Sequence, residues 1–148
     1  MTERFVDTYL LYLLARASSD ISNQFHRRLK NHSLQVPEWR VLASLSDGDG
    51  MTVGELANRA LQHQPTMTKI IDRMESSGLV QRRQGKPDRR TVGVFITTEG
   101  RRRVDAALED AKVHEAEVLA NYSAAETVRL KEMLMTLISR NEPQPHQD

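Results

Sequence analysis

The chain has 148 residues, of which 39% are hydrophobic and 28% charged, with a formal net charge of +1 and no cysteine. This length suits one domain, or one subunit that completes its core against a second copy of itself. The composition excludes disulfides and thiol-based sensing, and the absence of a signal-peptide pattern and of any apolar run near ~20 residues predicts a cytoplasmic protein without a membrane span.

The N-terminal third is predicted to hold two helices. Between residues 5 and 30, apolar side chains recur at steps of three and four, which is typical of one long amphipathic helix. Pro37 is expected to open the second helix, because proline is frequent at the first helical position. That helix carries Trp39 and is expected to end at the Asp-Gly-Asp-Gly turn of residues 47–50.

The next two predicted helices form a helix-turn-helix. Thr52 and Glu55 have the spacing of a capping box, which starts the third helix. Residues 61–64 are predicted to form a turn, Pro65 starts the fourth helix, and Gly78 ends it as the residue after the C-cap. The apolar side chains predicted to be buried on the fourth helix are Met67, Ile70, Ile71 and Met74.

A β-hairpin is predicted to follow the fourth helix. Residues 80–83 and 91–97 are rich in strand-forming side chains and flank a turn that contains Gly85 and Pro87. A helix-turn-helix followed by such a hairpin is a winged helix-turn-helix, and this order of elements is typical of DNA-binding proteins.

Two further helices are predicted in the C-terminal third. Thr97 or Thr98 is expected to cap a fifth helix over residues 99–120. Ser123 and Glu126 form a second capping box, which opens the sixth helix.

The predicted fold class is mainly α with a small β-hairpin wing (α+β), in a single domain over residues 1–148. One winged helix-turn-helix cannot cover the apolar faces of the first, fifth and sixth helices, so we expect a two-fold dimer in which terminal helices of both chains interdigitate. The alternative is a monomer with a helical cap. The expected DNA-binding lobe spans about 36–98, the dimerisation helices about 5–32 and 99–140, and a frayed tail 141–148.

Positive charge is concentrated in one segment. Residues 81–103 hold eight of the 21 basic residues and two of the 20 acidic residues, a net charge of +6 against −5 for the rest of the chain. A local basic patch on an otherwise acidic protein gives oriented attraction to a polyanion. The alternative is an ordinary solvated surface.

The helix at residues 65–77 is the expected recognition helix, which lies in the major groove and presents its N-terminal outward residues to DNA. Threonines there can bond base edges or phosphates, and Lys69 and Arg73 can reach guanine acceptors or phosphates. The alternative for these two is ordinary surface charge, and Gln64 either bonds a base or caps the helix. The candidate contacts are Gln64, Pro65, Thr66, Thr68, Lys69 and Arg73.

The wing, residues 83–91, supplies a second group of candidate DNA contacts. Arginines at its tip suit a narrow minor groove, where the negative potential is enhanced. Arg83 and Lys86 are expected to contact the DNA backbone, and Asp88 is expected to pair with an arginine of the hairpin and set the shape of the tip. The candidates are Arg83, Lys86, Asp88, Arg89 and Arg90.

These segments resemble the MarR family of bacterial transcription regulators over roughly residues 8–140. The most specific part is Asp88–Arg90 followed by Val92–Gly100, which is similar to the family's wing signature of Asp-x-Arg, a strand, and Leu/Ile-Thr-x-x-Gly. Trp39–Leu42 and Leu79–Arg82 also resemble family segments.

The resemblance implies a homodimeric winged-helix protein that binds a pseudo-palindromic promoter site in double-stranded DNA. Most members repress transcription, and many are released by a small ligand. By the same resemblance, Arg90 matches the wing arginine that enters the minor groove, and Asp88 matches its partner.

Effectors in this family are typically aromatic acids or phenols held between the dimer helices and the DNA-binding lobe, so the resemblance implies a ligand of that class. An arginine beside aromatic side chains can hold a carboxylate against a ring. The alternative is that these aromatic residues are core or dimer contacts and that Arg16 forms a surface or interface ion pair. The candidate ligand-binding residues are Tyr9, Tyr12, Arg16, Trp39, Arg40 and His63.

No enzyme, cofactor or metal site is expected, because the histidine spacing, phosphate-loop and serine-elbow signatures are lacking. His114, Glu115 and Glu117 could suggest a metal-responsive regulator, but the three cannot share one helix face. A winged-helix module that binds protein instead of DNA is a further alternative. The basic wing and polar recognition helix favour double-stranded DNA as the partner, with no membrane partner.

Overall fold

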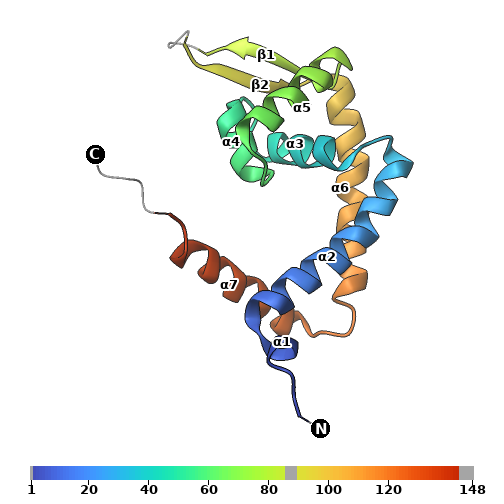
Figure 1. Ribbon diagram of the computed structural model, residues 1–148. Helices are drawn as coiled ribbons and strands as arrows, with labels where there is room; N and C mark the ends of the chain where they lie inside the picture. Colours follow the sequence, from blue (N-terminus) through green and yellow to red (C-terminus); the bar gives the residue numbers. More distant parts are fainter. Residues whose placement is uncertain (1, 86–89, 144–148) are drawn as a thin grey trace. The chain divides into compact units, whose positions relative to one another are not determined.

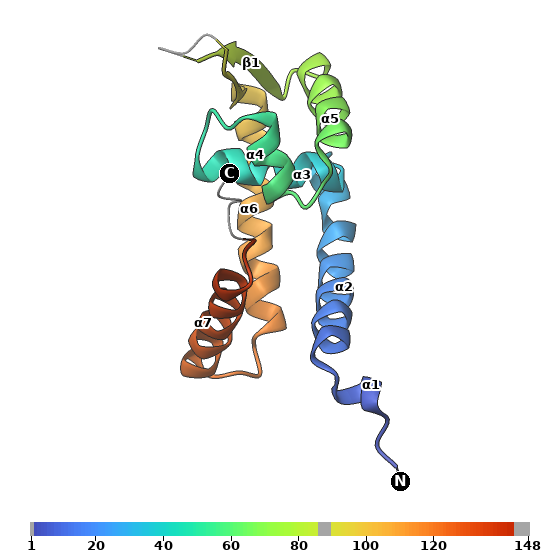
Figure 2. The same ribbon diagram turned by 60° about the vertical axis from the view of Figure 1, so that its left-hand side comes forward.

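The computed structural model describes residues 2–85 and 90–143, which form two compact units, Met1–Lys112 and Val113–Asp148. Figures 1 and 2 trace the chain from two directions. In chain order the elements are α1 (Phe5–Thr8), α2 (Leu10–Arg28), the 3₁₀ helix η1 (Leu29–His32), α3 (Val36–Asp47), α4 (Val53–Arg59), α5 (Gln64–Ser76), β1 (Val80–Gln84), β2 (Val92–Ile96), α6 (Thr98–Val118) and α7 (Ala124–Arg140). A mainly helical chain with one small hairpin confirms the predicted fold class.

The first unit contains the hydrophobic core. Helices α3, α4 and α5 and the hairpin gather at one end of it, and the first turns of α6 run alongside them in both views (Figures 1 and 2). The predicted inward residues of α4 and α5 are buried. The core residues with no measurable exposure include Leu42 and Leu45 of α3, Leu56 of α4, and Met67 and Ile71 of α5.

The hairpin is antiparallel, with Val80 opposite Ile96 and Gln84 opposite Val92. Val80 and Val94 point into the core, so the hairpin closes one side of the lobe. Met51, in the loop before α4, forms an isolated antiparallel bridge to Val94 and extends the hairpin toward the helices.

The predicted helix ends rest on specific backbone contacts. The Thr52 hydroxyl accepts from the Glu55 amide at 3.1 Å, and the Glu55 carboxylate accepts from the Thr52 amide at the same distance, which confirms the capping box. Gly78 has φ +76, and the next amide, of Leu79, donates to the Met74 carbonyl at 2.9 Å. Glycine favours this left-handed conformation, which ends α5 in a Schellman motif.

The prediction of one long helix over residues 5–30 is wrong at both ends. Tyr9 is extended (φ −72, ψ 124) and separates the four-residue α1 from α2. After Arg28 the chain tightens into η1, and Ser33 then takes a left-handed conformation with φ 54. The spacing of apolar side chains continues across Tyr9. Periodicity therefore predicts that these side chains lie on one face, but it does not reveal that the helix is interrupted at Tyr9.

The second unit begins at Val113, within the C-terminal part of α6, and includes α7. The predicted capping box is confirmed, since the Ser123 hydroxyl accepts from the Glu126 amide at 3.1 Å and the Glu126 carboxylate accepts from the Ser123 amide at 2.9 Å. Lys131 of α7 is paired with Glu115 of α6. Helix α7 contains no buried residue. Across residues 2–85 and 90–143, none of the helices is long and apolar enough to cross a membrane.

Candidate nucleic-acid interface

Helix α5 has one buried and one exposed face, as its spacing predicts. Met67, Ile70, Ile71 and Met74 are buried. The polar residues predicted to face outward are exposed: Gln64, Pro65, Thr66, Thr68, Lys69 and Arg73. The helix therefore presents hydroxyls, an amide and two cations to the surroundings.

The first turn of α5 begins at Gln64, and the residue before it, His63, is an extended N-cap without a side-chain cap. Gln64 is therefore inside the helix, and the interpretation that it caps the helix is wrong. The Thr68 hydroxyl donates to the Gln64 carbonyl at 3.0 Å. While this bond holds, Thr68 can accept a hydrogen bond from an outside donor, and its own proton is engaged.

Arg82 joins the wing to this helix. Its guanidinium donates to the carboxylates of Asp72 at 2.7 Å and Glu75 at 3.2 Å. The second Glu75 oxygen accepts from the Arg82 backbone amide at 2.7 Å. A longer bond joins Arg82 Nη2 to the Thr68 carbonyl at 3.5 Å. Together these bonds between β1 and α5 set the orientation of the hairpin relative to the exposed face of the helix.

The sequence analysis missed this contact, although Asp72 and Glu75 stand on the exposed face of α5 at a spacing of three. It also changes how the basic segment is interpreted. Arg82 is balanced by these two acids, and Arg102 and Arg103 are both paired with Glu99 at 2.6 and 2.9 Å. Among the described residues, Lys69 and Arg73 of α5 and Arg83 of the wing are exposed cations for which no ion pair with an acid is seen.

Within the wing, Arg83 is exposed and its guanidinium carbon lies 4.9 Å from the centre of the Phe95 ring. Its Nε and Nη2 donate to the Gln81 side-chain oxygen at 3.4 and 3.3 Å. Stacking on an aromatic face restrains a guanidinium without neutralising it. Arg90 is also exposed. Three predicted contacts, Lys86, Asp88 and Arg89, lie outside the described residues.

The base of the wing is held at two points where only a small residue fits. A Cβ added to Gly93 would lie 2.9 Å from the carbonyl oxygen of Gly50. A Cβ added to Gly100 would lie 2.2 Å from the Leu79 carbonyl oxygen. The Asp49 carboxylate accepts from the Ile96 amide at 2.9 Å. The loop before α4, the hairpin and the start of α6 are therefore closely packed.

Thr97 links the end of α5 to the start of α6. Its hydroxyl donates to the Gly78 carbonyl at 2.6 Å and accepts from the Gly100 amide at 3.1 Å. Thr97 is thus the residue that caps α6, of the two predicted. Because Gly78 ends α5, the same side chain connects the recognition helix to the helix that leaves the lobe.

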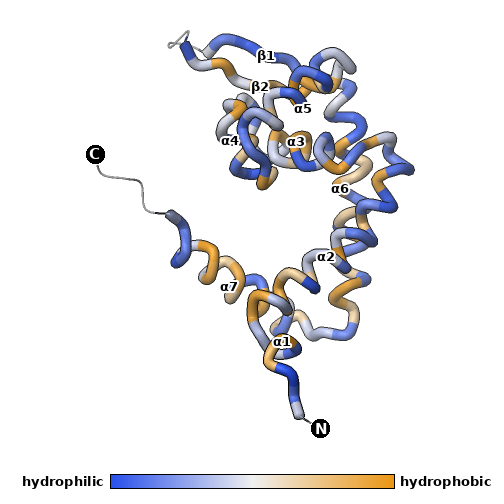
Figure 3. The backbone as a smooth tube through the Cα atoms, in the orientation of Figure 1, coloured by the Kyte–Doolittle hydropathy of each residue, from blue (hydrophilic) through white to orange (hydrophobic). Residues whose placement is uncertain are grey.

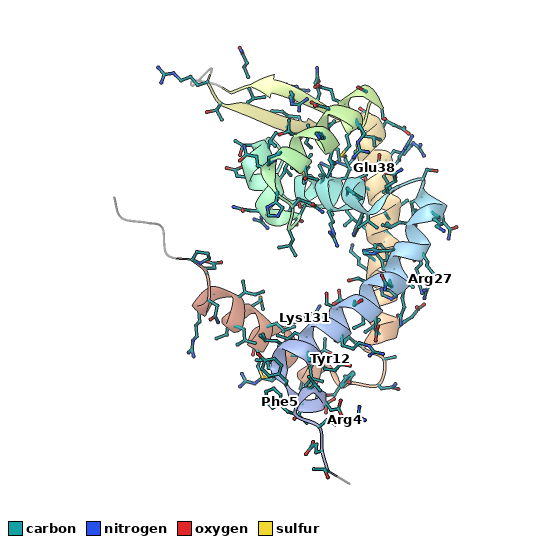
Figure 4. All side chains as sticks on the ribbon, viewed as in Figure 1. Arg4, Phe5, Tyr12, Arg27, Glu38 and Lys131 are labelled. Atoms are coloured by element: carbon teal, nitrogen blue, oxygen red, sulfur yellow. The ribbon has the colours of Figure 1, made fainter. Side chains whose placement is uncertain are left out.

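The candidate ligand-binding residues fall into separate groups. Tyr12 accepts a hydrogen bond from Arg16 at 3.3 Å, and Arg16 is also paired with Asp20 at 2.8 Å. Tyr9 stacks on Phe5 with ring centres 4.9 Å apart. Figure 4 labels Phe5 and Tyr12, which belong to α1 and α2. Arg16 thus lies beside a tyrosine, as the ligand hypothesis requires. It also forms an ion pair with Asp20, as the alternative interpretation predicts.

Trp39 and Arg40 lie at the start of α3 and are half-buried. Trp39 packs against Phe25 of α2, with ring centres 5.0 Å apart and ring planes inclined by 59°. Burial, and then the charge of Arg40, lower the pKa of His26. His26 is a neighbour of this group that the sequence analysis did not single out, since only tertiary structure brings α2 beside α3. His63 is exposed at the N-cap of α5.

The residues of the metal hypothesis do not form a site. His114 is buried, whereas Glu115 and Glu117 are exposed. Within residues 2–85 and 90–143, no group of three or more histidine or acidic residues could hold a metal ion.

Comparison with known proteins finds a match to the model of the MarR family over residues 34–92. The chain is 30% identical to the HTH-type transcriptional repressor IacR of Pseudomonas putida over 128 residues, which cover 86% of this chain and 77% of that protein. It is 31% identical to the HTH-type transcriptional regulator TtmR of Methylorubrum extorquens over 96 residues, 65% of this chain and 49% of the relative.

Solved structures extend the similarity to nearly the whole chain. A MarR family transcriptional regulator from Silicibacter pomeroyi is 39% identical, with a TM-score of 0.81, and the match covers 93% of this chain and 98% of that one. A Mycobacterium tuberculosis MarR family protein in complex with salicylic acid is 28% identical, with a TM-score of 0.71 and coverage of 86% and 95%. The curated relatives are transcriptional regulators and not enzymes.

Proposed function

Because the chain belongs to the MarR family of transcriptional regulators, we propose that it is a homodimeric repressor that binds a pseudo-palindromic promoter site in double-stranded DNA. The observation that carries the proposal is the exposed polar and basic face of α5, fastened to the wing through Arg82. A helix of this kind lies in the major groove and contacts base edges through side chains near its N-terminus.

The two DNA-contacting elements have different roles. On α5, Thr66, Lys69 and Arg73 are exposed and reach base edges or phosphates, with Thr68 as an acceptor. The wing over residues 83–91 follows the DNA backbone and the minor groove. Arg90 enters the groove and Arg83, restrained by Phe95, contacts phosphate.

The terminal helices support the dimer. Their apolar side chains are exposed to an extent that a single soluble chain rarely tolerates in contiguous stretches. On α2 these include Leu10, Leu11, Leu13 and Leu14, and on α7 Leu130, Met133, Leu137 and Ile138. We propose one MarR-type domain in which about 36–98 bind DNA, about 5–32 and 99–140 dimerise, and 141–148 are a tail.

We propose further that an aromatic carboxylate or phenol releases the DNA. The salicylic acid bound to the M. tuberculosis relative supports this class of ligand. In this chain the two arginine and aromatic groups, Tyr12 with Arg16 and Trp39 with Arg40, are candidate sites. Ligand would favour a dimer whose recognition helices no longer match successive major grooves, about 34 Å apart.

The central test is the substitution Arg90→Ala, measured by fluorescence anisotropy on the DNA upstream of the protein's own gene. Loss of one or two charged contacts predicts a tenfold to hundredfold weaker affinity, by order of magnitude. It also predicts a shallower dependence of affinity on salt. Arg4→Ala is the control, because Arg4 is exposed and lies outside the segments assigned to DNA binding and dimerisation.

Unchanged affinity for Arg90→Ala at physiological salt would refute the wing assignment. Absence of binding by the unsubstituted protein at low salt would refute the DNA function itself. Repeating the titration with salicylate, benzoate and neutral benzamide tests the ligand. Release by the acids in Arg40→Gln but not in Arg16→Gln would assign the ligand to Tyr12 and Arg16, and the reverse would assign it to Trp39 and Arg40.

A further inference from the structure

A hollow of about 210 Å³ lies between the turn after α2 and the first half of α6. It is lined by Asn31, His32, Ser33, Arg102, Arg103 and Ala106. The lining side chains offer two guanidiniums, an imidazole, an amide and a hydroxyl, and include no carboxylate. None of them belongs to α5, the wing or the two groups of candidate ligand residues.

The wall of the hollow formed by residues 31–33 is fixed by hydrogen bonds. Ser33 is left-handed, with φ 54, and its carbonyl accepts from Arg103 Nη1 at 3.3 Å. The Leu34 amide donates to the Leu29 carbonyl at 3.3 Å, which closes the turn. His32 Nε2 lies 3.0 Å from Asp110 Oδ2, so the imidazole is anchored from behind. A turn held this way presents its polar groups in a constant arrangement.

The two arginines share a single carboxylate. Arg102 donates to both Glu99 oxygens, at 2.9 and 2.6 Å, and Arg103 Nε donates to one of them at 2.9 Å. These bonds lower the pKa of Glu99 to about 2, so it is ionised at neutral pH and leaves one positive charge in excess. Among the described residues, no hydrogen bond engages Arg102 Nη1 or Arg103 Nη2.

We propose that this hollow binds a small oxyanion, the carboxylate or phosphate group of a small metabolite. Guanidiniums suit such groups because they are permanently charged and donate N–H bonds to oxygen. Here Arg102 Nη1 and Arg103 Nη2 together provide the donors for two oxygens of one anion. The space sets an upper size. An apolar cavity of about 150 Å³ holds one benzene ring, and sites for drug-sized ligands begin at about 300 Å³. The hollow therefore suits an acid of few heavy atoms.

The location gives such an anion a structural consequence. The turn at residues 31–33 leads into α3, and Arg102 and Arg103 lie near the start of α6, the helix that follows β2. The hollow therefore lies where the chain enters and leaves the winged helix-turn-helix. An anion held between them adds a link to the two present ones, from Arg103 to Ser33 and from His32 to Asp110. Binding to the folded state raises stability with ligand concentration.

The proposal is tested on the full-length protein without DNA, by following backbone amide and arginine Nε chemical shifts in NMR titrations. The probes are inorganic phosphate, sodium acetate and, as a neutral match for acetate, acetamide, all at constant ionic strength kept with chloride. We expect saturable shifts at Asn31, Ser33 and the Nε of Arg102 with phosphate, acetate or both, and none with acetamide. Which of the two anions binds more tightly identifies the headgroup.

Two variants and a matched control sharpen the test. Arg102→Gln removes an exposed guanidinium and is expected to weaken binding about tenfold or more, roughly one charged hydrogen-bonding contact. Glu99→Gln removes the internal competitor and is expected to tighten binding several-fold. Arg129→Gln is the control, because Arg129 is 71% exposed and paired with a glutamate three residues away, as Arg102 is at 70%.

The proposal is overturned by any of three results. These are shifts of equal size with acetamide, unchanged binding in Arg102→Gln, and absence of any shift beyond that caused by chloride. A rise in the unfolding temperature with phosphate that Arg102→Gln abolishes and Arg129→Gln retains would support it independently. Because the DNA face takes no part, failure of DNA binding leaves this test unaffected.

Discussion

The winged-helix lobe and the terminal helices use the same kind of amphipathic pattern with opposite results. Within the lobe, α3, α4 and α5 each have buried apolar residues, among which Leu42, Leu56 and Met67 have no exposed surface. Helices α1 and α7 bury no residue, and the longer α2 buries only Phe25. In Figure 3 hydrophobic segments recur along α7 and the start of α2 as they do in the lobe.

This difference shows that an amphipathic sequence pattern identifies which face of a helix must be covered. The pattern does not say whether the same chain or a second chain covers that face. Leu56 is fully buried by its own chain, whereas Leu13 and Met133 each remain 46% exposed. Burial of a leucine side chain stabilises a protein by about 1.5–3 kcal/mol. The exposed leucines of the terminal helices could therefore add substantial stability if a partner covered them. A second copy of the chain supplies the cover that we propose.

The largest effect is expected from the lobe. Leu56→Ala removes a fully buried side chain and leaves a cavity, which costs about 2–5 kcal/mol of unfolding free energy. Chemical denaturation at two protein concentrations measures it, and the loss should be the same at both. Leu13→Ala is the comparison, and its effect should appear only as a change in concentration dependence. If both substitutions lowered the unfolding free energy equally, and independently of protein concentration, the proposed difference between the lobe and the terminal helices would be refuted.

The next effect is on assembly. Leu137→Glu introduces a charge into the apolar face of α7, and burying it in a dimer should weaken association by about 100-fold, or ~2.7 kcal/mol. Sedimentation velocity over a range of micromolar concentrations measures the shift toward monomer.

Ser139→Glu is the control, because it adds the same charge on α7 at an exposed polar position away from that face. A substituted protein that remains dimeric would contradict the proposed role of α7. An unsubstituted protein that is monomeric and still binds DNA would refute the dimer altogether.

Local signals made much of the lobe predictable from the sequence. Capping boxes, the glycine after α5 and the β-hairpin depend on residues close together in the chain, and the structure confirms each. The break at Tyr9 was not predictable, because the side-chain spacing continues through it.

Contacts between distant segments were also out of reach. Arg82 meets Asp72 and Glu75 only because β1 folds back along α5, and Asp110 meets Arg28 and His32 across 82 and 78 positions. In the candidate site, the sequence identified the exposed face of α5 and missed the contacts that orient it. Side-chain type and spacing indicate exposure, whereas pairing depends on tertiary packing.

A smaller effect on stability is expected where α6 contacts the end of α2 and η1. Asp110 of α6 accepts from Arg28 at 3.0 Å and lies 3.0 Å from His32. The hydrogen bond with His32, and then Arg28, lower the pKa of Asp110. A carboxyl with a depressed pKa contributes stability above its unfolded pKa, near 3.8, and loses it as the pH falls through the folded value.

Asp110→Asn is therefore expected to cost about 1 kcal/mol at neutral pH, the scale of a partly exposed ion pair. The deficit should shrink toward zero as the pH is lowered below about 4, the usual carboxyl range. Urea unfolding at several pH values measures it. Glu109→Gln is the control, because that neighbouring acid is 73% exposed and paired with Lys112. A deficit that does not change with pH would show that the ion pair is not its cause.

The smallest expected effect is a gain, and it lies in the lobe that is otherwise well packed. Leu61, in the turn between α4 and α5, has φ 55 and is 87% exposed. The left-handed conformation costs a residue with a Cβ roughly 1–2 kcal/mol, and glycine avoids this while losing about 0.4–1 kcal/mol to unfolded-state entropy. Leu61→Gly should therefore stabilise the protein by roughly 0.5–1 kcal/mol. Leu61→Ala separates the causes by denaturation, since alanine keeps the strained backbone and removes only the exposed side chain. If Leu61→Ala raised the unfolding free energy as much as Leu61→Gly, the gain would come from removing the exposed leucine side chain. The backbone conformation would then not be its cause.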